Sequence, residues 1–317
     1  MDFLNSFIST FDSLLHKKKF ANLYVGLLLF IMLFSFILNR LDINITDNDV
    51  IKNYQLSKIY TDDFNKVETI IVGDSSCGNG INDKLFTSLS GSRTENLCLN
   101  GSWGLVGSLG IIKKSLLKNK KIKNIIIIQT LDIWNRSFPK EAVLELFEIS
   151  EIIDEINYKT IVGYLFNPKE IFWHLKYLLA YKELTTIDTS HDYVKQNNKK
   201  YSNNLRILEY EKNLNDIKLS NSKSKEIVMI DTFCRINGLN CIFLNGPIHN
   251  GIIKNSDKFI SYLNEDIINS FSHIKYHKNI FSYPNRYIGD SLDHIDIKYK
   301  DEVTKDYYLL VKPDLMR

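Results

Sequence analysis

A run of uncharged residues near the start of the chain constrains its fold more than any other feature. From Phe20 to Asn39 the sequence reads FANLYVGLLLFIMLFSFILN, without a charged residue. About 20 apolar residues is the length at which a helix crosses the hydrocarbon core of a bilayer. A signal peptide has a shorter apolar part and a small-residue cleavage site, which this sequence lacks. We therefore expect a transmembrane helix over residues 20–41, with a signal peptide and a buried core helix as the alternatives.

The charges beside this run predict its orientation. Three lysines precede it at positions 17–19, and Asp42, Asp47 and Asp49 follow it beyond Arg40. Positive residues stay on the cytoplasmic side of a membrane. Residues 1–19 are therefore expected in the cytoplasm, and the chain after residue 41 is expected outside it. We divide the outer part into a polar connector over residues 42–64 and a folded domain over residues 65–317.

The composition is that of a folded protein with no affinity for nucleic acid. Of 317 residues, 44% are hydrophobic and 24% are charged, and 40 basic residues against 37 acidic ones leave a net charge of +3. This balance lacks the basic excess that binds phosphate backbones, so no nucleic-acid partner is expected. The sequence also contains no ligand-spaced Cys/His cluster and no phosphate-cradling Gly loop, and we predict no metal and no organic cofactor.

The four cysteines all follow the apolar run, in a compartment that permits disulfides. They are Cys77, Cys98, Cys234 and Cys241. Local pairing of Cys77 with Cys98 and of Cys234 with Cys241 is one expectation. Four free thiols in a core are an equal alternative, because spacing alone does not determine pairing.

Short apolar runs that alternate with helical periodicity predict an α/β fold. The expected strands are Val67–Val72, Asn96–Leu99, Lys123–Gln129 and Asn240–Asn245. The expected helices are residues 105–118, 141–156, 168–182, 225–237 and 252–270. This alternation is typical of a parallel sheet between two layers of helices, with ligands bound beyond the carboxyl ends of the strands. Residues 184–224 are polar and rich in Asn, Lys and Ser, and we interpret them as a surface insertion.

The turn after the first expected strand places a serine where a nucleophile is expected. Residues 70–76 read IIVGDSS, so Ser75 follows the strand and the Gly73-Asp74 pair. A hydroxyl nucleophile needs a sharp turn after a strand, where its oxygen is exposed and nearby amides face a developing oxyanion. In the alternative interpretation, Asp74 or Ser75 is only the N-cap of an ordinary helix.

A second motif lies near the C-terminus. Residues 289–295 read GDSLDHI, with Asp290 four residues before His294 and Asp293 directly before it. A histidine activates a serine when a carboxylate orients its ring. The i, i+4 spacing favours Asp290 as that carboxylate, because neighbouring residues normally point apart. Asp293 stays open as the alternative.

Together, the Gly-Asp-Ser turn and the terminal Asp-and-His pair resemble the SGNH (GDSL-like) hydrolase superfamily. The resemblance covers roughly residues 66–305. It is closest to the membrane-anchored branch that works with membrane-bound O-acyltransferases in alginate and peptidoglycan O-acetylation and in teichoic-acid D-alanylation. It implies that Ser75 is the nucleophile, His294 the general base and Asp290 the orienting carboxylate. Many members have that aspartate three residues before the histidine, where this chain has Ser291.

The resemblance also implies which groups stabilise an oxyanion. The amide of Gly101, preceded by Asn100, matches the glycine of the second family block. The third block usually supplies an asparagine, where this chain has Leu131. Because one lost oxyanion donor costs about 3 kcal/mol of transition-state stabilisation, Thr130 or Asn100 is expected to replace it. Otherwise the chain is a slow, specialised enzyme or no general hydrolase.

Other residues at expected strand ends are candidates for substrate binding. They are Asp74, Asp132, Trp134, Arg136 and His249. An indole near a crevice stacks on sugar rings, although a large aromatic more often packs in a core.

These features predict an acyltransferase that modifies a cell-envelope polysaccharide by O-acetyl transfer through an acyl-serine intermediate. With one span and no cytosolic domain, the chain is expected to receive its acyl group through a multi-spanning membrane-bound O-acyltransferase. The alternatives are a polysaccharide acetylesterase and a non-catalytic glycan-binding or scaffolding partner of such a transferase. In each case the chain is expected to be a single-pass membrane protein whose C-terminal domain is periplasmic or at the cell surface.

Overall fold

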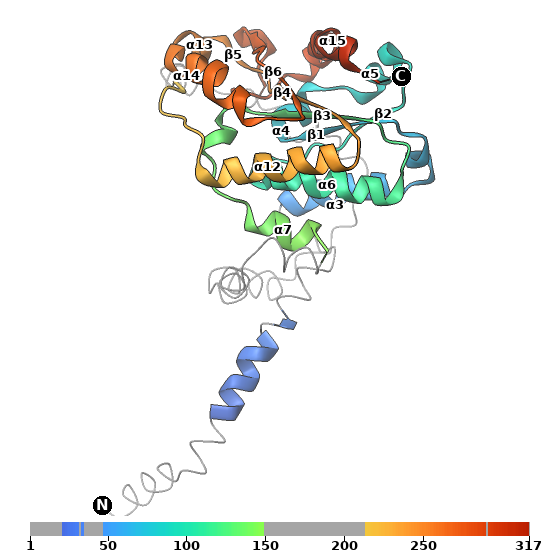
Figure 1. The fold of residues 1–317 in the computed structure, drawn as a ribbon, viewed down its shortest axis with the longest axis vertical. Helices are drawn as coiled ribbons and strands as arrows, with labels where there is room; N and C mark the ends of the chain where they lie inside the picture. The colour runs from blue at the N-terminus through green and yellow to red at the C-terminus, as the bar shows by residue number, and fades with distance from the viewer. Residues whose placement is uncertain (1–20, 32, 35–46, 149–212, 290, 317) are drawn as a thin grey trace, which may run out of the picture. The chain divides into compact units, whose positions relative to one another are not determined.

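The computed structural model describes residues 21–31, 33–34, 47–148, 213–289 and 291–316 (Figure 1). The chain divides into two compact units, residues 1–45 with 149–185 and residues 46–148 with 186–317. In the first unit, residues 21–31, 33 and 34 are helical. Among the described ranges, no helix combines the length and the apolar character needed to cross a membrane. Residues 20, 32 and 35–41 of the expected span lie outside those ranges.

The second unit is built on a five-stranded parallel sheet with the strand order β2-β1-β3-β4-β6. Its strands are β1 (Thr69–Gly73), β2 (Thr94–Asn96), β3 (Asn124–Gln129), β4 (Asn240–Asn245) and β6 (Lys275–His277). Two further strands, β5 (Ile248–His249) and β7 (Ser282–Tyr283), form a separate parallel pair. The chain passes from β1 to β2 on one side and then to β3 on the other. This reversal is the topological switch point at which such sheets bind ligands.

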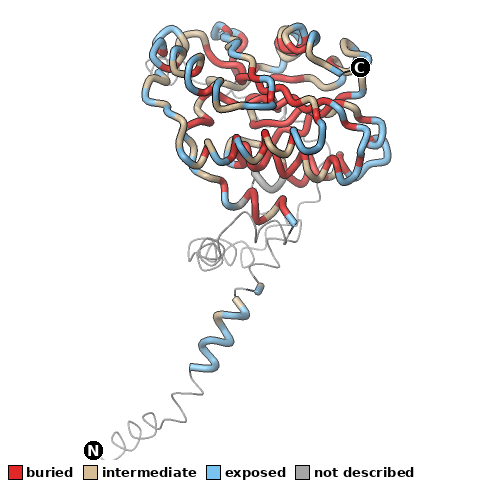
Figure 2. The backbone as a smooth tube through the Cα atoms, viewed as in Figure 1, coloured by how far each residue is buried: buried red, intermediate tan, exposed pale blue. Residues whose placement is uncertain are grey.

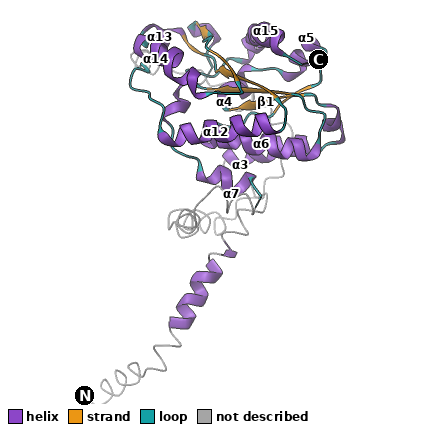
Figure 3. Ribbon diagram, viewed as in Figure 1, coloured by secondary structure: helices purple, strands orange, loops and turns teal. Residues whose placement is uncertain are grey.

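The central strands are apolar toward both faces because helices cover both faces. All residues of β1 and β3 are buried (Figure 2). One face is covered by α3 (Asp47–Ile59), α6 (Gly104–Lys118) and α12 (Asn221–Ile236), and the other by α5 (Asp83–Ser90) and α15 (Lys300–Val311) (Figures 1 and 3). The predicted α/β class with a parallel sheet between helices is therefore confirmed, since purely parallel sheets need cover on both sides.

The remaining helices are short. They are α4 (Ser75–Gly80), α7 (Lys140–Leu146), α13 (Asn250–Lys254) and α14 (Asp257–Tyr262). Single turns of 3-10 or π type lie at residues 62–66, 101–103, 131–135, 263–267, 268–270, 285–287, 297–299 and 312–314. The expected helix over residues 252–270 is thus divided into several pieces. The expected helix over residues 168–182 and residues 184–212 of the expected insertion lie outside the described ranges.

Two segments that were expected to be peripheral belong to the folded unit. Residues 47–59 of the expected connector form α3, in which Ile59 is fully buried and Gln55 Nε2 donates to the carbonyl of Cys98 at 2.7 Å. Residues 221–224, assigned to the polar insertion, begin α12, and the side chain of Lys223 is fully buried. Both segments are polar in sequence, but their polar side chains find buried partners in the fold, which composition alone does not indicate.

Asp231 of α12 stabilises the turn that leads into β6. Its Oδ1 accepts the amide hydrogens of Ser272 at 3.2 Å, His273 at 2.9 Å and Ile274 at 2.8 Å, and its Oδ2 accepts the Ser272 hydroxyl at 2.5 Å. Burial acts to raise the pKa of Asp231, but these hydrogen bonds, led by the Ile274 amide, outweigh it and the pKa is lowered. The ionised carboxylate therefore stabilises the folded state.

Asp231→Asn is expected to lower the free energy of unfolding at pH 7 by about 2 kcal/mol, because hydrogen bonds to a charged group contribute about 1.5–3 kcal/mol. Since the folded-state pKa is lowered, this stability is present above the ordinary value of 3.8 and is lost as the pH falls through the folded-state value. Urea unfolding at pH 7 and near pH 3 measures the difference between variant and wild type, which should shrink at the lower pH. Asp266→Asn, at an exposed position, is the control. A difference that is independent of pH would contradict this explanation.

Candidate functional site

The carboxyl ends of the parallel strands bring the candidate residues to one edge of the sheet. Ser75 follows β1, Gly101 lies in the turn after β2, and Thr130 directly follows β3. In a parallel sheet these ends share one edge, and the switch point between β1 and β3 lies within it. The edge expected to bind a ligand therefore carries the candidates that the sequence suggested.

The turn between β1 and α4 requires glycine at position 73. Gly73 has φ of 155°, and a Cβ atom there would lie 1.8 Å from the carbonyl oxygen of Ile128 in the neighbouring strand β3. No side chain fits such an approach, so the chain turns sharply here and enters α4 at Ser75. Asp74, not Ser75, caps this helix by accepting the amide of Ser76 at 3.0 Å. Of the two residues considered as the N-cap, Asp74 is the cap. The Ser75 hydroxyl takes no part in the capping hydrogen bond.

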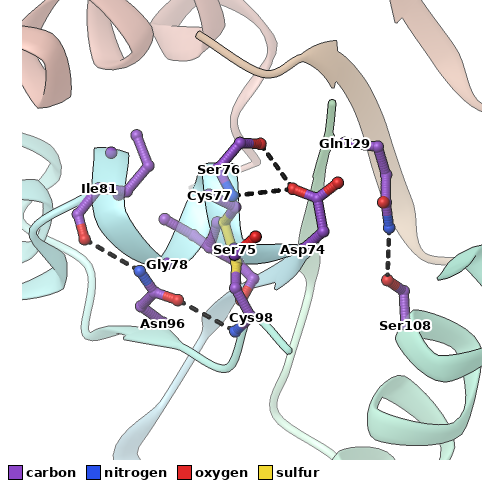
Figure 4. The surroundings of a disulfide bond; sticks show 12 residues. Asp74, Ser75, Ser76, Cys77, Gly78, Ile81, Asn96, Cys98, Ser108 and Gln129 are labelled. Atoms are coloured by element: carbon purple, nitrogen blue, oxygen red, sulfur yellow. Dashed lines mark hydrogen bonds between the residues drawn. A yellow bond between two sulfur atoms is a disulfide. The ribbon is translucent and has the colours of Figure 1, made fainter. Parts of the chain in front are cut away.

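Asp74 also joins this turn to the next strand. Its Oδ1 accepts the Ser76 hydroxyl at 2.6 Å (Figure 4), and its Oδ2 accepts the amide of Thr130 at 2.9 Å. The side chain of Asp74 is 1% exposed, so it is a buried positioning group and not a surface for substrate. Its hydrogen bonds fix the segment that carries Ser75 against the end of β3.

The C-terminal motif lies in a loop closed by an antiparallel bridge between Ile288 and Ile295. The amide of Gly289 donates to the carbonyl of His294 at 2.8 Å, and the amide of His249 donates to the carbonyl of Leu292 at 2.8 Å. His249, a candidate for substrate binding, is itself buried and caps α13 by accepting the Gly251 amide at its Nδ1. Through its backbone, it supports the loop that carries His294.

Among the described residues of this loop, Asp293 is the acidic side chain beside His294. Asp293 Oδ1 lies 3.8 Å from His294 Nε2 and accepts the hydroxyl of Ser291 at 2.5 Å. The expectation that Asp293 points away from His294 is therefore not met. The described residues 291–295 are not helical, so the helical spacing that set Asp293 aside does not hold for them. Asp290 itself lies outside the described residues.

The two motifs meet at Thr130. Its amide donates to Asp74 at 2.9 Å, and its hydroxyl lies near enough to the Asp293 carboxylate to lower the pKa of that group. This residue therefore connects the turn that carries Ser75 to the loop that carries His294, although the two come from opposite ends of the folded unit.

Asp74, which is buried, and Asp293, which is 18% exposed, have opposite pKa shifts. Burial raises the pKa of Asp74, and the charge of Asp293 raises it further, against the opposing effects of Ser76, Thr130 and Arg136. Burial also acts to raise the pKa of Asp293. The neighbouring His294 ring, the hydrogen bonds from Ser291 and Thr130 and the charge of Arg136 outweigh that effect, so the pKa of Asp293 is lowered. Asp293 is therefore the carboxylate suited to orient a histidine ring and to stabilise its protonated form.

Of the remaining candidates, Asp132 and Arg136 form an ion pair, and Trp134 is buried in the core. Arg136 Nη2 forms an ion pair with Asp132 Oδ1 at 2.7 Å, and the side chains of Arg136 and Asp132 are 33% and 48% exposed. Trp134 was a candidate for stacking on a sugar, but it is fully buried and packs against the rings of Phe243 and Phe271. It stabilises the core and is not accessible to a substrate.

The disulfide between Cys77 and Cys98 lies beneath the turn that carries Ser75 (Figure 4). It joins α4 to the segment after β2, and the Asn96 side chain reinforces this link by bonding the carbonyl of Ile81 and the amide of Cys98. A second disulfide joins Cys234 and Cys241. The local pairing of the four cysteines is thus confirmed, and the alternative of four free thiols is wrong.

Removal of the first disulfide is expected to loosen the Ser75 turn. For Cys77→Ser with Cys98→Ser, the loss of a cross-link across 21 residues lowers the free energy of unfolding by about 3 kcal/mol. Amide hydrogen exchange in residues 75–80 should also accelerate. Cys234→Ser with Cys241→Ser removes a cross-link across 7 residues, which costs about 2 kcal/mol, and should leave exchange in residues 75–80 unchanged. Equal exchange in both double variants would contradict a specific role of the first disulfide.

In the described part of the chain, no group of His, Cys, Asp and Glu side chains is arranged to hold a metal ion. Comparison with protein-family models, with curated proteins and with solved structures found no match.

Proposed function

We propose that this chain is a serine-dependent acyltransferase that moves an acyl group, most simply acetyl, onto a hydroxyl of a cell-envelope polysaccharide. The observation that carries the proposal is the position of Thr130, whose amide donates to Asp74 and whose hydroxyl lowers the pKa of Asp293. A serine at a sharp strand–helix turn and an Asp-His pair are together the parts of a nucleophilic triad. They also match the SGNH-like site that the sequence resembles.

In this proposal Ser75 Oγ attacks the carbonyl carbon of an acyl ester while His294 accepts the hydroxyl proton. The carbonyl electron pair moves to oxygen and then returns, and the bond to the leaving alkoxide breaks. Protonated His294 gives its proton to that alkoxide and leaves an acyl-Ser75 ester. A polysaccharide hydroxyl, deprotonated by His294, then attacks the ester, and Ser75 leaves as an alkoxide that takes the proton back. Asp293 stabilises the charged ring in both steps.

The proposal includes a membrane anchor at residues 20–41. The helical residues of this run expose large apolar side chains, among them Leu23 at 71% and Phe30 at 63%. Exposed apolar surface of this extent is typical of contact with lipid or with another protein. An outward-facing domain on such an anchor has no source of acyl donor of its own, so we include a multi-spanning membrane-bound O-acyltransferase as the partner that delivers it.

A non-catalytic glycan-binding or scaffolding role is the second candidate, and Leu131 is the observation that favours it. This side chain is 1% exposed and takes the place of the asparagine that the resembled family uses for its oxyanion. A polysaccharide acetylesterase would use the same residues as the transferase, with water in place of the glycan hydroxyl.

The test compares release of p-nitrophenol with transfer of the acetyl group. The full chain in a mild detergent is supplied with p-nitrophenyl acetate and with fragments of envelope polysaccharide, and mass spectrometry detects acetylated fragments. The transferase predicts release that accelerates with the acceptor and yields acetylated product. Release without acetylated product would assign the esterase instead. A folded protein that binds the fragments and releases no p-nitrophenol would overturn the proposal in favour of the scaffolding role.

A further inference from the structure

Arg136 lies directly over the backbone of Gly101 at the edge of the sheet. A Cβ atom built on Gly101 would lie 1.8 Å from Arg136 Nη1 and 2.9 Å from its Cζ. The guanidinium therefore occupies the space that any side chain at position 101 would take. Its other terminal nitrogen, Nη2, is held by Asp132 Oδ1 at 2.7 Å, four residues earlier in the chain. This ion pair holds the planar guanidinium in place with Nη1 over Gly101.

Arg136 is also close to the proposed nucleophilic site. The segment before Gly101 pairs with the end of β1, because the amide of Leu99 donates to the carbonyl of Gly73 at 2.9 Å, two residues before Ser75. Arg136, which lies over Gly101, is therefore beside the turn that carries Ser75. Its charge also lowers the pKa of Asp74 and that of Asp293.

Two of the other expected oxyanion groups already have partners at this edge. The amide of Thr130 donates to Asp74. The side chain of Asn100 caps the turn that follows β2 by accepting the amide and the hydroxyl of Ser102, at 3.1 and 2.5 Å. Leu131 offers no donor. A transition state that develops negative charge at this edge is therefore stabilised by a donor beside the Gly101 amide that takes the place of the one Leu131 lacks.

We propose that Arg136 donates an N–H of its guanidinium to the oxyanion that forms when Ser75 attacks an acyl carbonyl, and that Gly101 lacks a side chain because the guanidinium lies there. This inference rests on the proposed function and adds a catalytic residue to it. A guanidinium supplies a fixed fork of donors with a permanent charge, and it replaces the neutral asparagine amide that Leu131 does not provide. When the carbonyl electron pair moves onto oxygen, the charge forms against a donor that is already held in place by Asp132.

The role of Gly101 gives a test that leaves the charge of Arg136 intact. The atoms that an alanine at position 101 would meet are the far end of a flexible side chain, so Gly101→Ala displaces the guanidinium without disturbing a strand. Arg136→Ala removes the guanidinium itself, and Arg136→Lys keeps a charge without the fork. Arg93→Ala is the matched control, because Arg93 is half-exposed, pairs with Glu95 and lies at the start of β2.

The experiment measures kcat and KM for p-nitrophenyl acetate on the full chain, with melting temperatures to confirm folding. Arg136→Ala is expected to lower kcat by about 10²–10³-fold with little change in KM, as for the loss of one oxyanion donor. Gly101→Ala should lower kcat in the same direction, Arg136→Lys should be intermediate, and Arg93→Ala should match wild type. Added guanidinium ion at concentrations that do not unfold the protein should restore part of kcat in Arg136→Ala and none in Ser75→Ala.

Three results overturn the inference, and they differ from failure of the proposed function. If Ser75→Ala abolishes turnover while Arg136→Ala retains kcat, Arg136 is not the donor although the enzyme uses Ser75. A change confined to KM would make Arg136 a substrate-binding residue only, and a loss of kcat without rescue by guanidinium would make its role structural. If Ser75→Ala turns over p-nitrophenyl acetate at the wild-type rate, the proposed function itself fails.

Discussion

Replacing His294 by alanine is expected to lower kcat for p-nitrophenyl acetate by on the order of 10³-fold, because a positioned general base contributes about 10²–10⁴-fold. The side chain of His294 is 14% exposed and lies 3.8 Å from Asp293 Oδ1. It therefore has limited access to solvent and a carboxylate within ion-pair distance of its ring. Melting temperature and far-UV circular dichroism of the variant should match those of wild type, since the loop is closed by backbone bonds between Ile288 and Ile295 and between Gly289 and His294.

Asp293→Asn and Asp290→Asn form a matched pair that decides which carboxylate supports His294. The contact between Asp293 and His294 predicts that Asp293→Asn lowers kcat by about 10²-fold or more, because an amide neither orients nor stabilises the protonated ring. Asp290→Asn should lower kcat by a smaller factor. The reverse order of the two losses would assign the role to Asp290, as the sequence spacing suggested, and would contradict the geometry of the loop.

Glu226→Gln is expected to lower the free energy of unfolding by about 3–5 kcal/mol, because it leaves a buried lysine charge without its partner. Lys223 Nζ donates to both carboxylate oxygens of Glu226, at 2.8 and 2.7 Å, and both side chains are fully buried. Burial lowers the pKa of Lys223 and raises that of Glu226. The amides of Leu105 and Val106 act against this rise in the pKa of Glu226, so the pair lies against the first turn of α6.

The matched variant is the double substitution Lys223→Met with Glu226→Gln. It removes both charges and keeps an oxygen for the amides of Leu105 and Val106, so it should recover most of the loss caused by Glu226→Gln. Guanidinium chloride unfolding of Glu226→Gln, of Lys223→Met and of the double variant gives the interaction energy between the two side chains. A coupled buried pair would be contradicted if the losses of unfolding free energy in the two single variants added up to the loss in the double variant. It would also be contradicted if Glu226→Gln were as stable as wild type.

The central strands of the sheet were predictable because their burial on both faces requires continuous apolar sequence. The expected strand Asn96–Leu99 was misplaced, because β2 is Thr94–Asn96 and the apolar residues after it are buried without forming a strand. β3 reads NIIIIQ and β4 reads NCIFLN, and both lie where the sequence placed them. The outer strand β6 reads KYH, with only Tyr276 buried, and no apolar run distinguishes it from a loop. Edge strands of this kind are defined by pairing with a neighbour, which a single sequence does not show.

The turn that carries Ser75 and the loop that carries His294 were predictable from the sequence. The contacts that join them were not. The glycine and small polar residues after β1 indicated the turn at Ser75, and a close approach of Gly73 to Ile128 is the physical reason for them. The orientation of Asp293 depends on an antiparallel bridge between residues that the motif itself does not contain. The bridging role of Thr130 depends on the distance between two loops, and no local pattern reports that distance.

Buried polar residues were the least predictable feature. Lys223 lies in the stretch KLSNSKSK, whose composition indicates a solvated surface, but Glu226 on the next turn allows it to be buried. Trp134 presents the opposite case, because its place after a strand suggested a ligand contact while Phe243, Phe271 and Tyr276 enclose it in the core. In both cases tertiary packing determines the environment of the side chain.

The most direct test of the account is to capture the acyl group on the chain. The full-length protein is mixed with p-nitrophenyl acetate, quenched in acid within the time of a few turnovers and analysed by intact mass and peptide mapping. Ser75→Ala and Ser76→Ala are the paired variants, because the Ser76 hydroxyl is buried and bonded to Asp74 at 2.6 Å. The account predicts one acetyl group on Ser75 in wild type and in Ser76→Ala, and none in Ser75→Ala. An acetyl group that persists in Ser75→Ala, or turnover by wild type without any acetyl-enzyme, would contradict it.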